Sequence, residues 1–307
     1  MGARRDRGVF WAGIALLVAG TLIAYRLLLG PEPGSTVAPP PAPASPDPAL
    51  RLAVATVTGE VSLVRAGIRT RAAPGDELKA DDAIETAPGA RVELAGATYH
   101  VGLEEGGRFS VKEITAELSR FGLGAGAVSA QVADDPNRSF EIEASQGAVM
   151  RTRGADLSVS RSGDVMAVGV RRGSAEFSAA GRSVLLGERQ QSLAAAGGPP
   201  SAPAPLPTSL LLKVRWPESR ETNRRRIVVT GRTAPGATVL LGGQPVEVQP
   251  DGRFTHVVVL REGRQQLAAR AHGVAGSAAS QGPMVVLDTR APDARFETRD
   301  LWVRPRQ

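Results

Sequence analysis

Short apolar runs separated by glycine set the strongest limit on the fold of this chain. From about residue 50 to 195, and again from 210 to 288, these runs recur roughly every 8 to 12 residues, a spacing typical of short strands in a β-sandwich or barrel. Gly and Pro together make up 58 of the 307 residues, and aromatic residues only 4%. The sequence therefore predicts an all-β fold whose core consists of Val, Leu, Ala and Ile.

Alternation of apolar and polar residues indicates which side chains point inward. One stretch leaves two structures open: in residues 110–121, Ile114, Leu118 and Phe121 are spaced for one face of a helix. Because its neighbours all resemble strands, we expect β-structure there. The first candidate inward residues are Leu52, Val54, Val61 and Leu63.

An apolar segment of 21 residues, 9–29, precedes this region. As a helix it would be about 30 Å long, which matches the hydrocarbon thickness of a bilayer. Trp11 and Tyr25 lie near its two ends, and Arg26 can extend its charge to the interface. The basic stub 1–8 is expected to stay in the cytoplasm. The segment thus predicts a single-pass inner-membrane protein with its bulk in the periplasm.

A cleaved secretory signal is the alternative interpretation of segment 9–29. A signal peptide needs a small-x-small cleavage site directly after its apolar core. The nearest such site, 42–44, lies well downstream and contains proline. A membrane anchor is therefore the preferred prediction, and the absence of cysteine excludes attachment through a lipidated cysteine.

Two segments rich in proline divide the rest of the chain. Residues 30–48 and 194–208 each contain one apolar residue larger than alanine besides proline, Val37 and Leu206, and predict extended, semi-rigid linkers. Recognition by a proline-binding module is a less favoured use of the first one. The linkers delimit one β-domain at 49–193 and a second at 209–289, followed by a basic tail at 290–307.

Positive charge is concentrated in the last third of the chain. Residues 201–307 contain 16 Lys and Arg against 9 Asp and Glu. With a periplasmic location, nucleic acid is not expected as a partner, and lipid head groups, anionic glycans or acidic proteins are more available. Arg224, Arg226 and Arg232 are the candidate anion- or partner-binding rim. The simpler interpretation is a solvated strand start, since consecutive strand residues point to opposite faces.

The residue pattern offers no catalytic, metal or cofactor site. His100, His256 and His272 are far apart in sequence, and the chain has no cysteine. It also lacks a nucleophile-elbow motif and a phosphate-binding glycine loop. We therefore expect a non-enzymatic protein. Three carboxylate pairs are interpreted as solvated turn residues: Asp81/Asp82, Glu104/Glu105 and Asp134/Asp135.

A resemblance to a known family emerges between residues 74 and 190. Its opening pattern is a Gly-Asp pair, an apolar residue, a second Asp, an apolar residue and a Thr, followed by an alternating strand. The matching residues are Gly75, Asp76, Leu78, Asp82, Ile84, Thr86, Val92 and Leu94. This region resembles FecR-type domains, with three departures: Asp81 stands where the family usually has Gly, Ala95-Gly96-Ala97 where it has Asp-Gly-Ser, and Gly154-Ala155 where it has Gly-Thr. The resemblance implies a β-domain, and some members of the family are transmembrane regulators of sigma factors.

The second domain resembles bacterial immunoglobulin-like repeats. The resemblance rests on a Pro-Gly-Ala strand start at 235–237, a Gly-Gly hairpin at 242–243 and an Asp-Gly-x-Phe turn at 251–254. Expected buried residues include Val239, Leu241, Val246, Val248, Phe254, Val257, Val259, Leu267 and Ala269. Such repeats serve both as spacers and as binding modules, so this resemblance implies fold and not function.

The sequence is compatible with three functions. The leading one is a membrane-anchored envelope protein that presents two β-domains for structural or binding work, with cell-wall glycan or another envelope protein as partner. The alternative is a FecR-type signalling regulator of a sigma factor. It would act through a separate protein, because the stub 1–8 is too short to fold into a sigma-binding domain. An enzyme of envelope polysaccharide is least favoured.

Overall fold

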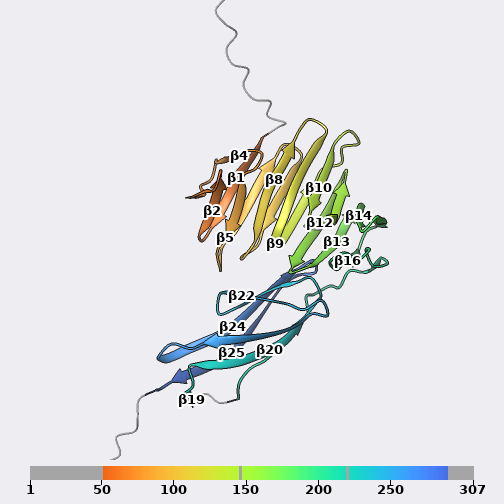
Figure 1. The fold of residues 1–307 in the computed structure, drawn as a ribbon. Coiled ribbons are helices and arrows are strands. Elements are labelled where there is room, and N and C mark those ends of the chain that lie inside the picture. The colour runs from red at the N-terminus through yellow and green to blue at the C-terminus, as the bar shows by residue number, and fades with distance from the viewer. Residues whose placement is uncertain (1–50, 145–146, 219–220, 290–307) are drawn as a thin grey trace, which may run out of the picture. The chain divides into compact units, whose positions relative to one another are not determined.

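A computed structural model describes residues 51–144, 147–218 and 221–289. These residues belong to a single compact unit, Pro46–Gln307, and form strands without any α-helix (Figure 1). Within the described ranges, no helix has the length and apolar content needed to cross a bilayer. The predicted span 9–29, with Trp11, Tyr25 and Arg26, and the predicted tail 290–307 lie outside the described residues. The all-β prediction is confirmed.

Strands β1–β17 form two layers of neighbouring strands. The first layer runs in the order β4 (Glu77–Leu78), β1 (Leu52–Thr58), β6 (Arg91–Gly96), β7 (Tyr99–Leu103), β9 (Leu118–Val132), β12 (Ala155–Ser162), β13 (Val165–Gly173), β16 (Gln190–Ala194) and β17 (Ala204–Pro205). The second runs in the order β3 (Ile68–Arg71), β2 (Val61–Arg65), β5 (Ala83–Thr86), β8 (Arg108–Ile114), β9, β10 (Ser139–Glu143), β11 (Val149–Thr152), β14 (Ala175–Ala179) and β15 (Arg182–Leu186). Among these pairs only β9 and β10 run parallel.

Strand β9 belongs to both layers. Its first half pairs with β8 and β10, and its second half pairs with β7 and β12. The change of layer occurs around Gly126, whose φ of 103° is open to glycine but strained for other residues. A Cβ at Gly126 would lie 2.5 Å from the Cα of Gly107, so the backbones can approach here only without a side chain. Glycine at this position lets one strand connect the two sheets.

The two layers share one apolar core. Leu52 and Val54 from the first layer and Val61 and Leu63 from the second are all buried in it, as their alternation predicted. Four aromatic rings lie between the sheets: Tyr99, Phe109, Phe121 and Phe140, with centroid distances of 5.1 to 5.6 Å for the contacting pairs. The few aromatic residues of this region thus suffice to fill the centre of its core, because they lie together at one place.

Residues 110–121 are β-structure, as expected. They contribute the end of β8 and the start of β9, which a turn at residues 115–117 connects. The Thr115 side chain accepts a hydrogen bond from the Leu118 backbone N–H at 3.0 Å and so closes this turn. The helical spacing of Ile114 and Phe121 therefore has no helical counterpart, since the two residues lie on opposite arms of a hairpin.

The segment predicted as the second linker is partly packed against the first part of the chain. Strand β17, within residues 194–208, pairs with β16, and the Ser201 backbone and hydroxyl hydrogen-bond to β16. A Cβ at Gly169 would lie 2.8 Å from the Leu206 side chain, which shows how closely this segment approaches β13. Its proline content predicts an extended backbone, and extended backbone is also what pairing along a sheet edge requires.

The C-terminal region packs two sheets across its own core. One sheet has the order β18 (Leu212–Arg215), β20 (Arg226–Thr233) and β23 (Arg253–Val259). The other has the order β19 (Glu221–Thr222), β25 (Gly276–Leu287), β24 (Gly263–Gly273), β21 (Thr238–Leu241) and β22 (Gln244–Val246). Their core contains Val229, Val239, Leu241, Val246, Val248, Phe254 and Ala269. The assignment of this sandwich to the immunoglobulin-like class stays a prediction.

Two residues predicted to be buried in β23 are exposed. Val257 is 46% and Val259 64% exposed, whereas Phe254 is 2% exposed. Residues an odd number of positions apart on a strand point to opposite faces, so Val257 and Val259 cannot share the face of Phe254. The prediction was wrong for these two valines because it placed even- and odd-numbered residues of one strand on the same face.

Candidate functional site

The opening motif of the first region, residues 75–86, forms a turn and part of the core. Gly75 has a φ of 93°, and the Asp76 carboxylate accepts a hydrogen bond from the Ala73 backbone N–H at 2.8 Å. Leu78 and Ile84 are buried in the core. The motif therefore specifies how the chain turns from one sheet layer into the other.

Asp82 is buried, contrary to the prediction that it faces water. It is 3% exposed and accepts hydrogen bonds from Arg65 at 2.7 to 3.1 Å and from the Lys79 backbone N–H at 2.8 Å. Burial alone would raise the pKa of this carboxyl, but the hydrogen bonds and the positive charge of Arg65 outweigh it, and the pKa lies below its usual value. Asp82 thus joins β2 to the turn before β5.

Thr86, the last motif residue, holds the loop between β7 and β8 against the end of β5. Its hydroxyl donates to the Glu104 carbonyl at 2.6 Å and accepts from the Gly107 backbone N–H at 2.9 Å. One contact precedes Glu105 in the sequence and the other follows it. The motif thereby positions the carboxylate of Glu105.

Glu105 is the centre of a buried polar cluster, which the sequence interpretation missed. It is 5% exposed and accepts hydrogen bonds from the Gly89 backbone N–H, from Arg270 Nη1 at 3.1 Å and from His272 Nε2 at 2.9 Å. His272 is 7% exposed, and its Nδ1 lies 2.9 Å from the Ser277 hydroxyl. Burial would raise the pKa of Glu105, but the hydrogen bonds from His272 and Gly89 and the charge of Arg270 lower it below its usual value.

Glu141 forms a third buried carboxylate site. On adjacent strands, Arg120 and Arg151 flank it in register, with Nε–O distances of 2.9 and 2.6 Å. Glu141 is 4% exposed. Its burial raises the pKa, but hydrogen bonds from Arg151 and Arg120 and their charges lower it below the usual value. This arrangement stabilises the sheet and leaves no oxygen of Glu141 free for chemistry.

We expect the stability of the protein to fall as pH drops, with Glu141 contributing to the fall. Because its pKa is lower in the folded than in the unfolded state, its stabilising contribution is present above the unfolded pKa of about 4.3 and is lost as pH falls through the folded pKa. Glu141→Gln should lower the melting temperature at pH 7. The melting temperature of this variant should also fall less between pH 6 and pH 3 than that of the unchanged protein. Circular dichroism melts across this range measure both effects.

Glu60→Gln is the matched control for this prediction, because Glu60 is exposed and the substitution makes the same change of charge. It should reproduce the pH profile of the unchanged protein. A Glu141→Gln profile parallel to that of the unchanged protein would show that the two arginines do not favour the ionised carboxylate in the folded state.

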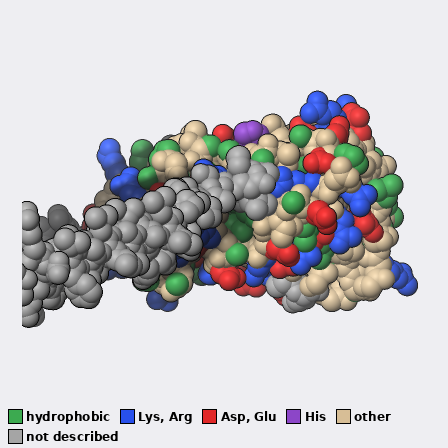
Figure 2. Space-filling model, turned by 90° about the horizontal axis from the view of Figure 1, so that it is seen from above, with side chains coloured by type: hydrophobic (Ala, Val, Ile, Leu, Met, Phe, Trp, Pro, Cys, Tyr) green, Lys and Arg blue, Asp and Glu red, His purple; other side chains and the backbone are tan. Residues whose placement is uncertain are grey.

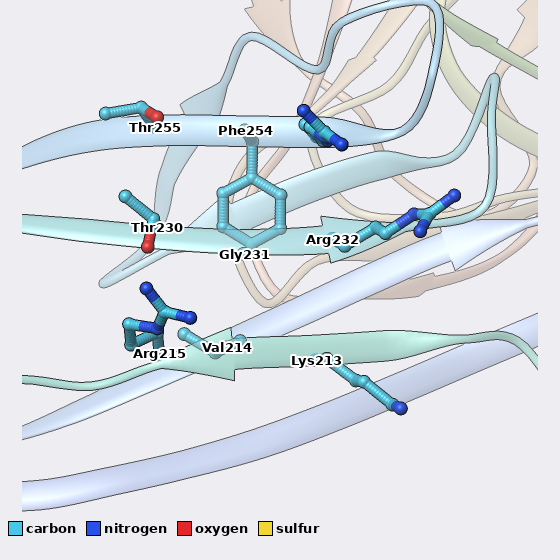
Figure 3. Close-up of a pocket in the computed structure, with 9 residues that line it drawn as sticks. Lys213, Val214, Arg215, Thr230, Gly231, Arg232, Phe254 and Thr255 are labelled. Carbon is cyan, nitrogen blue, oxygen red and sulfur yellow. The ribbon is translucent and has the colours of Figure 1, made fainter.

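An open hollow of about 730 Å³ lies on the sheet β18–β20–β23. It is lined by the cationic side chains of Lys213, Arg215, Arg232 and Arg253, together with Thr230 and Thr255 (Figure 3). We call it the cationic hollow. Its charged residues come from three strands that are hydrogen-bonded in the order given.

The structure brings only one of the three predicted rim residues into the cationic hollow. Arg232 lines it, whereas Arg226 lies at the opposite end of β20 and Arg224 precedes that strand. The sequence interpretation missed Lys213 and Arg253. Their alternation with inward residues was visible in the sequence, but only the register Lys213↔Arg232↔Arg253 shows that they lie side by side.

The three histidines do not converge in the structure. His100 is exposed on β7, and His256 lies on β23, whereas His272 contacts Glu105. Across the described ranges, no group of three His, Asp or Glu side chains is placed to hold a metal ion.

Comparisons with known proteins find similarity in the first region. The FecR family, described as FecR protein, matches residues 82–176. No curated protein sequence matches the chain. Two crystal structures of a candidate anti-sigma factor from Parabacteroides distasonis ATCC 8503 align with 40% of this chain and 59% of theirs, at 19% identity and a TM-score of 0.36. A polysaccharide lyase structure aligns with 78% of this chain and 40% of its own, at 9% identity and a TM-score of 0.20.

These structural likenesses are too distant to support a function, whereas the family match agrees with the residues that carry the sequence motif. It begins at the buried Asp82 and includes the core residue Ile84 and the loop-anchoring Thr86. It ends in β14, within the two-layered region. Residues 82–176 of this chain are a FecR domain.

Proposed function

We propose that this chain is a membrane-anchored regulator of the FecR type, which acts through a partner protein to control a sigma factor. The FecR domain at residues 82–176 is the observation that supports this function. The apolar segment 9–29 supports an anchor in the inner membrane, with the β-structure in the periplasm. In this proposal the FecR domain provides a surface for the partner protein, and its buried carboxylates, Asp82, Glu105 and Glu141, hold the fold together through their hydrogen bonds.

Deleting the gene should change the transcription of a discrete set of promoters that depend on one sigma factor, by several-fold, and the full-length gene should restore it. Affinity purification of the full-length chain from cross-linked membranes should recover a sigma-factor regulator. An unchanged transcript profile would contradict the regulatory function.

The anchor is tested separately, by alkaline phosphatase fused after Gln307, which should be active and should lose activity when residues 9–29 are removed.

A purely structural or binding role in the envelope is the second candidate. The cationic hollow favours it, because this open, charged surface is suited to bind a ligand and lies outside the FecR domain. Under this function, deletion of the gene would alter envelope integrity without a change in transcription. The same deletion strain therefore distinguishes the two candidates.

A further inference from the structure

The cationic hollow is arranged in two rows that run across the strands. Lys213, Arg232 and Arg253 are direct cross-strand neighbours and form the first row. Adjacent strands are about 4.8 Å apart, so three positive charges lie along a line about 10 Å long. Arg215, Thr230 and Thr255 form the second row, two residues farther along each strand. Figure 3 shows the labelled members of both rows on the same sheet.

The fold does not neutralise this concentration of charge. The hollow has no acidic lining residue, and the ion pair found there joins Arg253 to the exposed Asp251 at 3.3 Å. Among the described residues, Lys213, Arg215 and Arg232 have no ion pair. By contrast, Arg65, Arg120 and Arg151 of the first region all contact carboxylates, and the face in Figure 2 shows Lys and Arg interspersed with Asp and Glu.

Like charges opposite each other on neighbouring strands destabilise a sheet. The hollow therefore costs folding free energy that the exposed Arg253–Asp251 ion pair offsets only in part, and an external anion would recover the rest.

Two occupants from the chain itself fit this charge poorly. Residues 290–307 contain five arginines against three acidic residues, so the tail carries the same sign as the hollow. A second copy that docked symmetrically would place the two cationic rows against each other, and like-charge contact across an interface is unfavourable.

Other anionic macromolecules lack matching features. A flat bilayer surface cannot follow a concave hollow. The exposed Val228 and Val257 form the next row on the same face of the sheet but contribute no side chain to the lining, so a partner within the hollow itself contacts only charged and hydroxyl groups. A single-stranded nucleic acid needs exposed aromatic rings for stacking, and the aromatic residue of the lining, Phe254, is buried.

We propose that the cationic hollow binds a linear acidic polysaccharide that carries carboxylates at regular intervals. The row of Lys213, Arg232 and Arg253 receives successive carboxylates, for which the planar guanidinium groups provide paired N–H donors. The Thr230 and Thr255 hydroxyls face the sugar hydroxyls beside them. The hollow is open to solvent, which suits a chain longer than the site. This binding site lies outside the FecR domain, so it stands independently of the regulatory function.

Polygalacturonate is the probe for this proposal, and the full-length chain in mild detergent is the protein to use. We expect binding that weakens as salt is raised. Lys213→Gln combined with Arg232→Gln should raise the dissociation constant about tenfold, since each exposed charge contact contributes modestly. Arg172→Gln combined with Arg182→Gln is the matched control. Both of these arginines are exposed strand residues of the first region, and the double variant should bind within about twofold of the unchanged chain.

Three further probes separate polysaccharide from other anions. Carboxyl-reduced polygalacturonate should not bind, because it keeps the sugar hydroxyls but loses the charge. Polyglutamate and vesicles of phosphatidylcholine with phosphatidylglycerol should bind at least tenfold more weakly. Equal affinity for polyglutamate or for the vesicles would overturn the proposal, as would equal binding of polygalacturonate by the Lys213/Arg232 variant. A result in either direction leaves the transcription test of the regulatory function unaffected.

Discussion

Replacing Phe121 with alanine should lower the free energy of unfolding by about 4 kcal/mol, as expected for the loss of a fully buried aromatic side chain. Phe121 is 0% exposed and contacts Tyr99, Phe109 and Phe140 at centroid distances of 5.6, 5.1 and 5.3 Å. It also lies on β9, the strand shared by both layers. Its removal would leave a cavity between the sheets. Urea unfolding followed by far-ultraviolet circular dichroism measures the loss.

Two control variants make this result specific. Phe121→Leu keeps most of the apolar volume and should cost only about 1 kcal/mol. Val228→Ala removes an apolar side chain that is 59% exposed, and should change stability by less than about 0.5 kcal/mol. An alanine variant of Phe121 that unfolds within about 1 kcal/mol of the unchanged protein would mean that the aromatic cluster does not hold the layers together.

Replacing His272 with alanine should have the second-largest effect, a loss of about 3 kcal/mol, because it leaves the buried Glu105 carboxylate without one of its donors. Glu105→Ala should cost a similar amount. These two residues are 167 positions apart in sequence and interact at 2.9 Å. The double variant should therefore cost less than the sum of the single variants by at least about 1 kcal/mol.

His100→Ala is the control for this cycle, since His100 is exposed on β7 and should be replaceable with little loss. If the two single effects simply add, then Glu105 and His272 are not energetically coupled and the polar cluster does not join its two segments in solution. Urea unfolding is again the measurement.

The sequence predicted the class of the fold well because strand alternation is a local property. The inward positions of β1 and β2 follow from the period-two alternation alone. The error at Val257 and Val259 came from ignoring that period over one strand. The exchange of β9 between layers could not be predicted, since it depends on the close approach of Gly126 to Gly107.

The candidate sites were harder to predict because they are made by contacts between distant residues. Asp82 and Glu105 resemble solvated turn residues in sequence, and only the fold shows the arginine and histidine that permit their burial. In the same way, Arg232 was identified from local charge. Its neighbours Lys213 and Arg253 are set by strand register, which alternation does not reveal.

Strand β9 also limits how this architecture can be divided. A cut at Gly126 would give each fragment a sheet that ends at half of a strand, with its edge unpaired where the other half had been. Neither piece could close its own hydrogen-bond ladder. Breakpoints compatible with folding are therefore those that leave β9 whole, at the hairpin turns between strands.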